Sequence, residues 1–223
     1  MPKGTEAIPP ARVCAELGPL LLDERRARID AAAATRLSGL RVVIENLHDP
    51  HNGAAVLRSA EAFGVQRVEV IETVEPFRYS STVTQGCEKW LDVVRHKTLA
   101  AAVAGLRADG FAIYAAVPGA AVALDDLDFS RRAAVMVGNE HEGLTAEAIA
   151  AADVRFGIPM HGLTQSLNLS VATALIVERA STLRRRALGA ATDLSEEAIL
   201  DLRARFYAAS VRGADVILAR AVS

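Results

Sequence analysis

The sequence predicts an α/β protein in which a mostly parallel sheet is covered by helices on both faces. Short apolar, β-branched runs alternate with helical runs along most of the 223 residues, as expected when helical crossovers join parallel strands. The strand runs are nearly continuously apolar, so both faces of the sheet should be buried. Hydrophobic residues make up 51% of the chain and aromatic residues only 4%, which indicates an aliphatic core of Leu, Val and Ile packed on Ala.

The elements follow in order along the chain. A helical stretch over 9–37 is expected first, interrupted near Gly18-Pro19 and ended by Gly39. Strands are expected at 40–44, 67–71, 92–95, 111–115, 133–137 and 154–158. Helices are expected at 53–63, 99–108, 146–151 and from about 167 to 188. A last amphipathic helix is predicted over 194–209, with Ser195 as its cap and acidic residues in its first turn.

Composition excludes several classes of protein. No apolar run approaches the roughly 18 residues that a membrane-spanning helix needs, and the N-terminus lacks the apolar core of a signal peptide. Cys14 and Cys87 lie in unrelated contexts without a CxxC or Cys/His cluster, so neither a disulfide framework nor a metal site is expected. We therefore expect a cytoplasmic protein with no membrane segment and no metal.

Charge is more informative by its distribution than by its sum. The net charge is −2, so the chain as a whole is no polycation. Of its 25 basic residues 22 are arginine, and two groups stand out, namely Arg25, Arg26 and Arg28, and Arg184, Arg185 and Arg186. Each group fits a solvated helix face, and each also fits a phosphate-binding surface, because the planar guanidinium suits phosphate.

Ligand sites of open α/β sheets gather in the loops beyond the carboxyl ends of the strands, and three such loops here are rich in polar residues. The first, 45–53, contains Asn52 and is followed by Arg58 about two helical turns away. Asn52 could cap the helix and Arg58 could be a surface charge. Alternatively, both side chains could address one site.

The second loop, 136–145, and the third, 158–170, leave similar alternatives open. Gly138 and Gly143 allow a ligand to approach the backbone closely, while Thr145 could cap the next helix. The second loop matches neither GxGxxG nor a P-loop, so nucleotide triphosphate chemistry has no support. Ser166 and Asn168 open a long helix, either as caps or at a site where its free N–H groups receive a ligand.

Taken together, in this order and spacing, the three loops resemble the three motifs of the SpoU (TrmH) branch of the SPOUT methyltransferases. The resemblance extends from about residue 20 to residue 186, and Gly86 and Trp90 also fit the pattern. The matching motifs are Glu45-Asn46 through Asn52 to Arg58, then Gly138-Asn139-Glu140 with Gly143, then Ile158-Pro159-Met160 with Gln165-Ser166-Leu167-Asn168-Leu169-Ser170-Val171-Ala172.

This resemblance implies a fold whose C-terminal part forms a trefoil knot that binds S-adenosyl-L-methionine. It also implies a homodimer that methylates a ribose 2′-hydroxyl in RNA. The expected layout is a helical extension at 1–38, the methyltransferase domain at 39–188 and a second helical extension at 189–223. Extensions at both ends are most similar to the TrmH members, whose target is guanosine 18 in the D-loop of tRNA.

The resemblance also assigns roles to individual residues. The catalytic residues it implies are Arg58, Asn52, Glu140, Ser166 and Asn168. The cofactor would contact Gly138, Ile158, Met160 and Leu167. RNA contacts are assigned to Arg25, Arg26, Arg28, His51, Arg184, Arg185 and Arg186. Because free arginine has a pKa above roughly 12, we expect Arg58 to stabilise the developing alkoxide rather than to act as a base.

Three alternative functions remain at this point. The first is 2′-O-methylation of another tRNA nucleotide or of ribosomal RNA, since His141-Glu142, His161 and the segment after Gly189 lack clear counterparts in the family pattern. A non-catalytic RNA-binding relative is the second, although the intact motif residues argue against it. A methyltransferase for small molecules is the third, and the arginine groups disfavour it.

Overall fold

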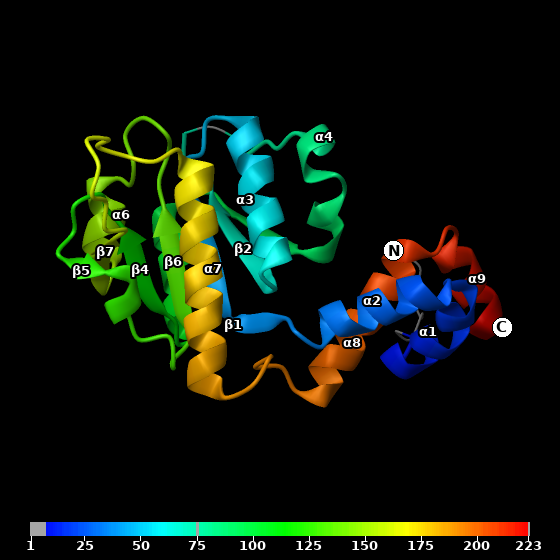
Figure 1. The fold of residues 1–223 in the computed structure, drawn as a ribbon. Helices are drawn as coiled ribbons and strands as arrows, with labels where there is room; N and C mark the ends of the chain where they lie inside the picture. The colour runs from blue at the N-terminus through cyan, green and yellow to red at the C-terminus, as the bar shows by residue number, and fades with distance from the viewer. Residues whose placement is uncertain (1–7, 75, 223) are drawn as a thin grey trace. The chain divides into compact units, whose positions relative to one another are not determined.

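The computed structural model describes residues 8–74 and 76–222, which divide into two compact units (Figure 1). We call residues 37–193 the α/β unit, and residues 8–36 together with 194–222 the helical unit. The two terminal segments, treated as separate extensions in the sequence analysis, thus contribute to the same unit.

The described residues of the α/β unit form a seven-stranded sheet in the order β3-β2-β1-β6-β4-β7-β5. Every pair of neighbouring strands is parallel. The strands are β1 (Leu37–Glu45), β2 (Val65–Ile71), β3 (Asp92–His96), β4 (Ala112–Ala116), β5 (Val122–Ala123), β6 (Ala133–Val137) and β7 (Val154–Gly157). This confirms the predicted parallel α/β sheet. The two-residue strand β5 is too short to have been expected from periodicity.

Helices cover both faces of the sheet, as the apolar strands predicted. α3 (Pro50–Ala62) and α7 (Leu169–Leu188) pack side by side over one face (Figure 1). α5 (Leu99–Ala108) and α6 (Ala146–Ala151) pack over the other. Short helical segments lie in the connections, namely α4 (Ser81–Thr84), η2 (Cys87–Trp90) and η3 (Leu124–Asp126). Both core clusters are mainly aliphatic, as the low aromatic content requires.

The strand order determines where a ligand can bind. β1 pairs with β2 on one side and with β6 on the other, so the direction of winding reverses at β1. In parallel sheets of this kind the loops after the strands diverge at such a point and leave a crevice at the carboxyl edge. The three polar loops follow β1, β6 and β7 and therefore lie at this edge.

Several boundaries differ from the sequence prediction. Gly39 does not end a helix, because α2 (Asp23–Ala33) ends earlier and Gly39 lies within β1. A Cβ at Gly39 would lie 2.0 Å from Nη2 of Arg184, so the glycine makes room for that guanidinium. Helix α3 begins at Pro50 and is capped by Asp49, whose side chain accepts from the His51 N–H at 2.8 Å. Asn52 is therefore not the cap.

The helical unit contains α1 (Pro10–Leu17), η1 (Gly18–Leu20), α2, α8 (Glu196–Ser210) and α9 (Ala214–Val222). The predicted break at Gly18-Pro19 and the Ser195 cap are confirmed, since Ser195 Oγ accepts from the Ala198 N–H at 3.2 Å. Tyr207 donates to Asp30 at 2.8 Å and joins α8 to α2. Burial and this carboxylate raise the pKa of Tyr207 to about 12, so its hydroxyl stays protonated at neutral pH.

Neither a membrane-spanning helix nor a metal cluster occurs among the described residues. No helix in residues 8–74 or 76–222 combines the length and apolar character needed to cross a bilayer. Within the same ranges, His, Cys, Asp and Glu form no group of three that could hold a metal ion.

Candidate functional site

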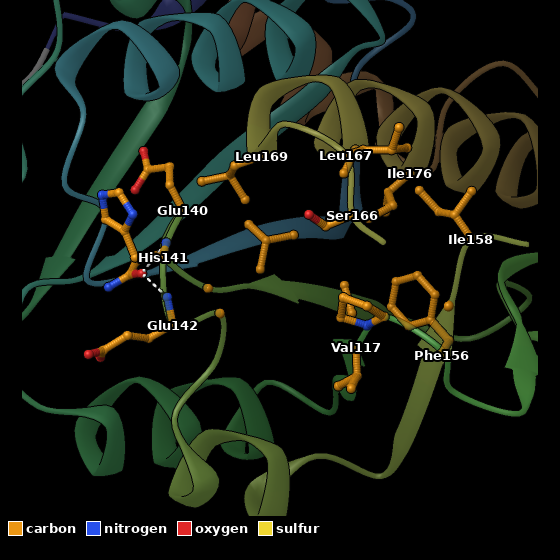
Figure 2. Close-up of a pocket in the computed structure, with 18 of the residues that line it drawn as sticks. Val117, Glu140, His141, Glu142, Phe156, Ile158, Ser166, Leu167, Leu169 and Ile176 are labelled. Carbon is orange, nitrogen blue, oxygen red and sulfur yellow. Dashed lines mark hydrogen bonds between the residues drawn. The ribbon is translucent and has the colours of Figure 1, made fainter. Parts of the chain in front are cut away.

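A cavity of about 300 Å³ opens at the carboxyl edge of the sheet (Figure 2). The ends of β4, β6 and β7 form its floor, and the first turns of α7 cover it. Glu140, His141 and Glu142 lie at one end, whereas Val117, Phe156 and Ile158 lie at the other (Figure 2). One end of the cavity is thus polar and the other apolar.

Glycine shapes the second loop on the polar side of the cavity. A Cβ at Gly138 would lie 1.9 Å from the carbonyl carbon of Gly143, so no larger residue fits there. Gly143 itself has φ +71°, a left-handed conformation that glycine adopts without strain. Asn139 Oδ1 accepts from the N–H groups of His141 and Glu142 at 2.8 and 2.7 Å (Figure 2), which closes the loop into a tight turn.

Glu140 connects the second loop to the first. Its carboxylate accepts from Asn52 Nδ2 at 2.8 Å and from the backbone N–H groups of His48 and Asp49, both at 3.2 Å. Burial raises the pKa of Glu140, but these hydrogen bonds outweigh burial and leave the pKa below its usual value. Glu140 is therefore ionised at neutral pH, where it holds the first loop against the second, and it is a poor proton acceptor.

The third loop joins the same cluster through Asn168. Asn168 Nδ2 donates to Asn52 Oδ1 at 3.3 Å, so Asn52 bridges Glu140 and Asn168. Asn168 Oδ1 accepts from the N–H of Ser170 at 2.8 Å and from that of Val171 at 3.4 Å, which caps α7. The helix begins at Leu169 rather than at 167. Asn168 therefore caps α7, as one of the two alternatives predicted, and the same side chain also contacts Asn52.

Arg58 faces a different neighbour from Asn52. Six residues along a helix correspond to about 600° of rotation, so the two side chains leave α3 in different directions. Asn52 is buried against Glu140, whereas Arg58 is exposed and its Nη1 donates to the Val83 carbonyl at 3.1 Å. Within the described residues of this chain, α3 does not present both side chains to one cluster.

The residues assigned to the cofactor all reach the cavity. Gly138, Ile158, Met160 and Leu167 line it, and Ser166 lines it as well. Sequence reasoning missed Val117 and Phe156, which come from the ends of β4 and β7. The sequence places Phe156 in a predicted strand and Val117 just after another, and it gives no sign that the two residues meet. They meet because β4 pairs with β7.

A second contact that the sequence did not predict connects the first two loops. Glu45, at the end of β1, is buried and accepts from the Thr145 N–H at 2.8 Å and from Thr145 Oγ1 at 2.7 Å. Thr145 also caps α6 as predicted, by accepting from the Ala148 N–H at 3.1 Å. The motif match included Glu45, but only the fold reveals its partner.

The arginines assigned to RNA differ in accessibility. Arg28, Arg186 and the His51 side chain are exposed, and Arg25, Arg26 and Arg185 are half-buried. Arg184 has to be removed from this group because it is only 4% exposed. Its guanidinium pairs with Asp193 at 2.6 Å and donates to the carbonyls of Arg131 and Phe129 at 2.8 and 3.3 Å, so it is committed to internal contacts.

Comparison with known proteins agrees with this geometry. The model of the SpoU rRNA Methylase family matches residues 39–178, more than half of the chain. The tRNA (guanosine(18)-2′-O)-methyltransferase of Escherichia coli K12 is 38% identical over 164 residues, which are 73% of this chain and 72% of that protein. The enzyme of the same name from Thermus thermophilus is 36% identical over 166 residues, 74% of this chain and 86% of that one.

Solved structures agree as well. The TrmH/SpoU tRNA modifying enzyme of A. aeolicus superposes with a TM-score of 0.74 at 28% identity, covering 85% of this chain and 98% of that one. The SpoU methyltransferase AviRb from Streptomyces viridochromogenes, in complex with AdoMet, has a TM-score of 0.62 at 25% identity over 68% of this chain and 62% of that one. With a parallel sheet that places all three motif loops at one edge, this chain belongs to the SpoU rRNA methylase family.

Proposed function

We propose that the protein transfers a methyl group from S-adenosyl-L-methionine to the 2′-hydroxyl of guanosine 18 in the D-loop of tRNA. The observation that carries this proposal is the Asn52–Glu140–Asn168 cluster, which joins all three motif loops beside one cavity. The choice of guanosine 18 rests on the two enzymes of that name, which are 38% and 36% identical to this chain.

The cavity fits the proposed cofactor. Its volume lies at the lower end of the roughly 300–1,000 Å³ range of small-molecule sites, and its apolar end suits an adenine ring. The backbone of Gly138, Ile158 and Leu167 offers hydrogen-bonding groups in the loops around it. S-adenosyl-L-methionine supplies, when bound, an electrophilic methyl group on a sulfonium. The protein must then hold the ribose in line with that methyl group and stabilise the charge that develops on the 2′-oxygen.

We assign charge stabilisation to Arg58. Its Nη1 donates to a carbonyl, and a guanidinium offers several more N–H donors in a planar fork that can hold an oxyanion. Glu140 is no candidate base, because three donors hold its carboxylate in the ionised form. We therefore assign Glu140 and Asn52 to positioning the first and second loops, and Ser166 and Asn168 to positioning the third loop over the cavity.

The function is tested by incubating the protein with S-adenosyl-L-methionine carrying a labelled methyl group and either total tRNA or ribosomal RNA. Label should enter tRNA, and nucleotide mapping should place it on the ribose of guanosine 18. Label on another tRNA nucleotide or in ribosomal RNA would replace the proposed target. No label in either RNA, with the cofactor bound, would favour a non-catalytic RNA-binding relative.

Asn168→Ala should weaken both cofactor binding and methyl transfer. Loss of the α7 cap costs roughly 1 kcal/mol, so the loop that carries Leu167 is held less firmly and cofactor affinity should fall by about fivefold. Asn168→Ser is the matched control, because a serine retains a capping oxygen but cannot donate to Asn52 as the amide does. The affinity of Asn168→Ser for the cofactor, measured by calorimetry, should equal that of the wild type. Its rate of methyl transfer should remain low, because the hydrogen bond to Asn52 is lost. Equal cofactor affinity in wild type and Asn168→Ala would remove Asn168 from the cofactor site.

We also propose that two copies associate through α7. Val171 and Leu175 lie four residues apart in α7 and are 49% and 48% exposed, which places them on one face of the helix. Met160, Leu163 and Leu167, in the third loop that precedes α7, are apolar residues that are also exposed. Exposed apolar side chains that gather on one surface are typical of an interface.

The double variant Val171→Glu/Leu175→Glu should therefore be monomeric at micromolar concentration, whereas the wild type should scatter light as a dimer. Two carboxylates cannot be buried against a second apolar face without a large desolvation cost. Val216→Glu, which replaces a residue of α9 that is 51% exposed, is the control and should remain dimeric. A monomeric wild type would contradict the proposed dimer.

Three further expectations remain proposals. We place the methyltransferase domain at 39–188 between two helical extensions, 1–38 and 189–223. We expect its C-terminal part to form a trefoil knot. Family membership supports this expectation, as does the position of the first turns of α7, which line the same cavity as the second loop. A cytoplasmic location is supported by the proposed tRNA substrate and by Cys14 and Cys87, which are both free thiols.

A further inference from the structure

The segment of residues 76–90, here called the flank segment, lies along α3 beside the site. The Ser80 N–H donates to the Pro50 carbonyl at 3.1 Å, at the first residue of the helix. One turn further, a Cβ at Gly53 would lie 2.8 Å from the Arg78 carbonyl, so the missing side chain lets the flank segment approach. The contact between Arg58 and the Val83 carbonyl extends this packing to the proposed catalytic residue.

The flank segment and Arg58 present positive charge to solvent. Arg58, Arg78 and Lys89 are exposed, and in the described part of the chain none of the three forms an ion pair with a carboxylate. Lys89 Nζ lies 4.7 Å from the centroid of the Trp90 ring, a cation–π contact that leaves its charge uncompensated. By contrast, Glu72 pairs with two cations near the neighbouring strand β3. These are Arg95, which lies within the strand, and Lys97, which follows it.

Among the described residues, the acidic groups near the flank segment do not cancel this charge at the surface. Glu88, within the flank segment, is half-buried, and its Oε2 is closed off from solvent. Glu61 of α3 is half-buried and has a partner of its own. Exposed hydroxyls accompany the cations, because Ser81 and Thr82 lie at the surface of α4. Unpaired cations with adjacent hydroxyl donors form a surface that suits the phosphates of a nucleic acid strand.

We propose that the flank segment binds the RNA strand next to the target nucleotide, with Arg78 and Lys89 each contacting a phosphate. The flank segment follows β2 and so leaves the sheet at the same carboxyl edge as the three motif loops. A strand that delivers a ribose to Arg58 therefore passes over it. These contacts lie within the α/β unit and are independent of the arginines of the helical unit.

The test compares Arg78→Gln/Lys89→Gln with a charge-matched control, Arg131→Gln/Arg155→Gln. Arg131 and Arg155 are also exposed cations of the α/β unit, but they lie just before β6 and within β7 rather than along α3. Both double variants change the net charge equally, so a long-range effect of charge is common to the two. The dissociation constant for tRNA is measured at several salt concentrations, and cofactor affinity is measured in parallel as a check of folding.

Each phosphate contact contributes roughly 0.7–0.9 to the slope of log K against log salt, so the Arg78/Lys89 variant should lose roughly 1.4–1.8 units of slope. At 0.1 M salt this corresponds to roughly 25-fold or greater loss of affinity for tRNA. Arg78→Lys/Lys89→Arg, which retains both charges, should keep most of the slope. Cofactor affinity should be unchanged in all variants.

A slope and affinity equal to those of the Arg131/Arg155 control would overturn the proposal. This proposal rests on an RNA substrate, so the wild type is assayed for tRNA methylation in the same preparations. Failure of the wild type to bind and methylate tRNA would refute the function. An active wild type with an unaffected Arg78/Lys89 variant would refute the flank surface alone.

Discussion

Replacing Arg58 by alanine is expected to lower kcat for methyl transfer by roughly 10²–10³-fold, the effect of removing one donor that stabilises developing negative charge. The guanidinium is exposed on α3 and held by the Val83 carbonyl. It is absent from the residues that line the cavity, so cofactor affinity measured by calorimetry should be unchanged. The loss should persist at saturating tRNA, since it concerns the transition state rather than substrate binding.

Two further variants make this result specific. Arg58→Lys keeps the charge but loses the planar fork, so it should recover only part of the activity. Arg155→Ala removes an exposed arginine from β7 and should methylate as the wild type does. Wild-type kcat in Arg58→Ala would remove Arg58 from the mechanism. A rise in KM without a fall in kcat would reassign Arg58 to RNA binding.

Arg184→Ala is expected to destabilise the α/β unit by about 3–5 kcal/mol, as when one partner of a buried ion pair is removed. Asp193 would lose its cation while remaining near β1, where its carboxylate accepts from the N–H groups of Ser38 and Gly39 at 2.7 and 2.9 Å. The carbonyls of Phe129 and Arg131 would also lose their donor. Urea denaturation of the variant and the wild type measures the difference in unfolding free energy.

The stability that the Arg184–Asp193 pair contributes should depend on pH in a defined direction. Burial raises the pKa of Asp193, but hydrogen bonds from Ser38, Gly39 and Arg184 together leave it below its usual value. A lowered carboxylate pKa stabilises the fold above the pKa of the unfolded chain, and this stabilisation is lost as pH falls through the folded value. The difference between wild type and Arg184→Ala should therefore be largest near neutral pH and should shrink in acid.

Arg186→Ala is the matched control, because Arg186 lies two residues further along α7 and is exposed. It should change stability by less than about 0.5 kcal/mol. Combining Arg184→Ala with Asp193→Ala should cost less than the sum of the two single changes, since the second removes the uncompensated charge. A loss below about 1 kcal/mol in Arg184→Ala would contradict the structural role and return Arg184 to the candidates for RNA contact.

Local patterns in the sequence determined much of the fold. The strand at 133–137 and the helices at 99–108 and 146–151 have the predicted bounds, because apolar runs and caps are read from neighbouring residues. Thr145 and Ser195 cap their helices as expected, since a capping hydroxyl bonds only three residues ahead. The three motifs also indicated the family, because their residue types and spacing are properties of the chain itself.

Tertiary structure decided which distant residues meet. Glu140 and Asn52 are 88 positions apart, and Asn168 and Asn52 are 116 apart, so no local pattern relates them. The same reason applies to Arg184, which the sequence predicts as part of a basic helix end. It is buried because Gly39 leaves room for its guanidinium and Asp193 supplies the opposite charge. The direction of Arg58 depends on the packing of α4 against α3. The sequence determines the periodicity of the elements and local caps such as Thr145 and Ser195. Burial and the choice of distant partners arise only when the sheet brings separate elements together.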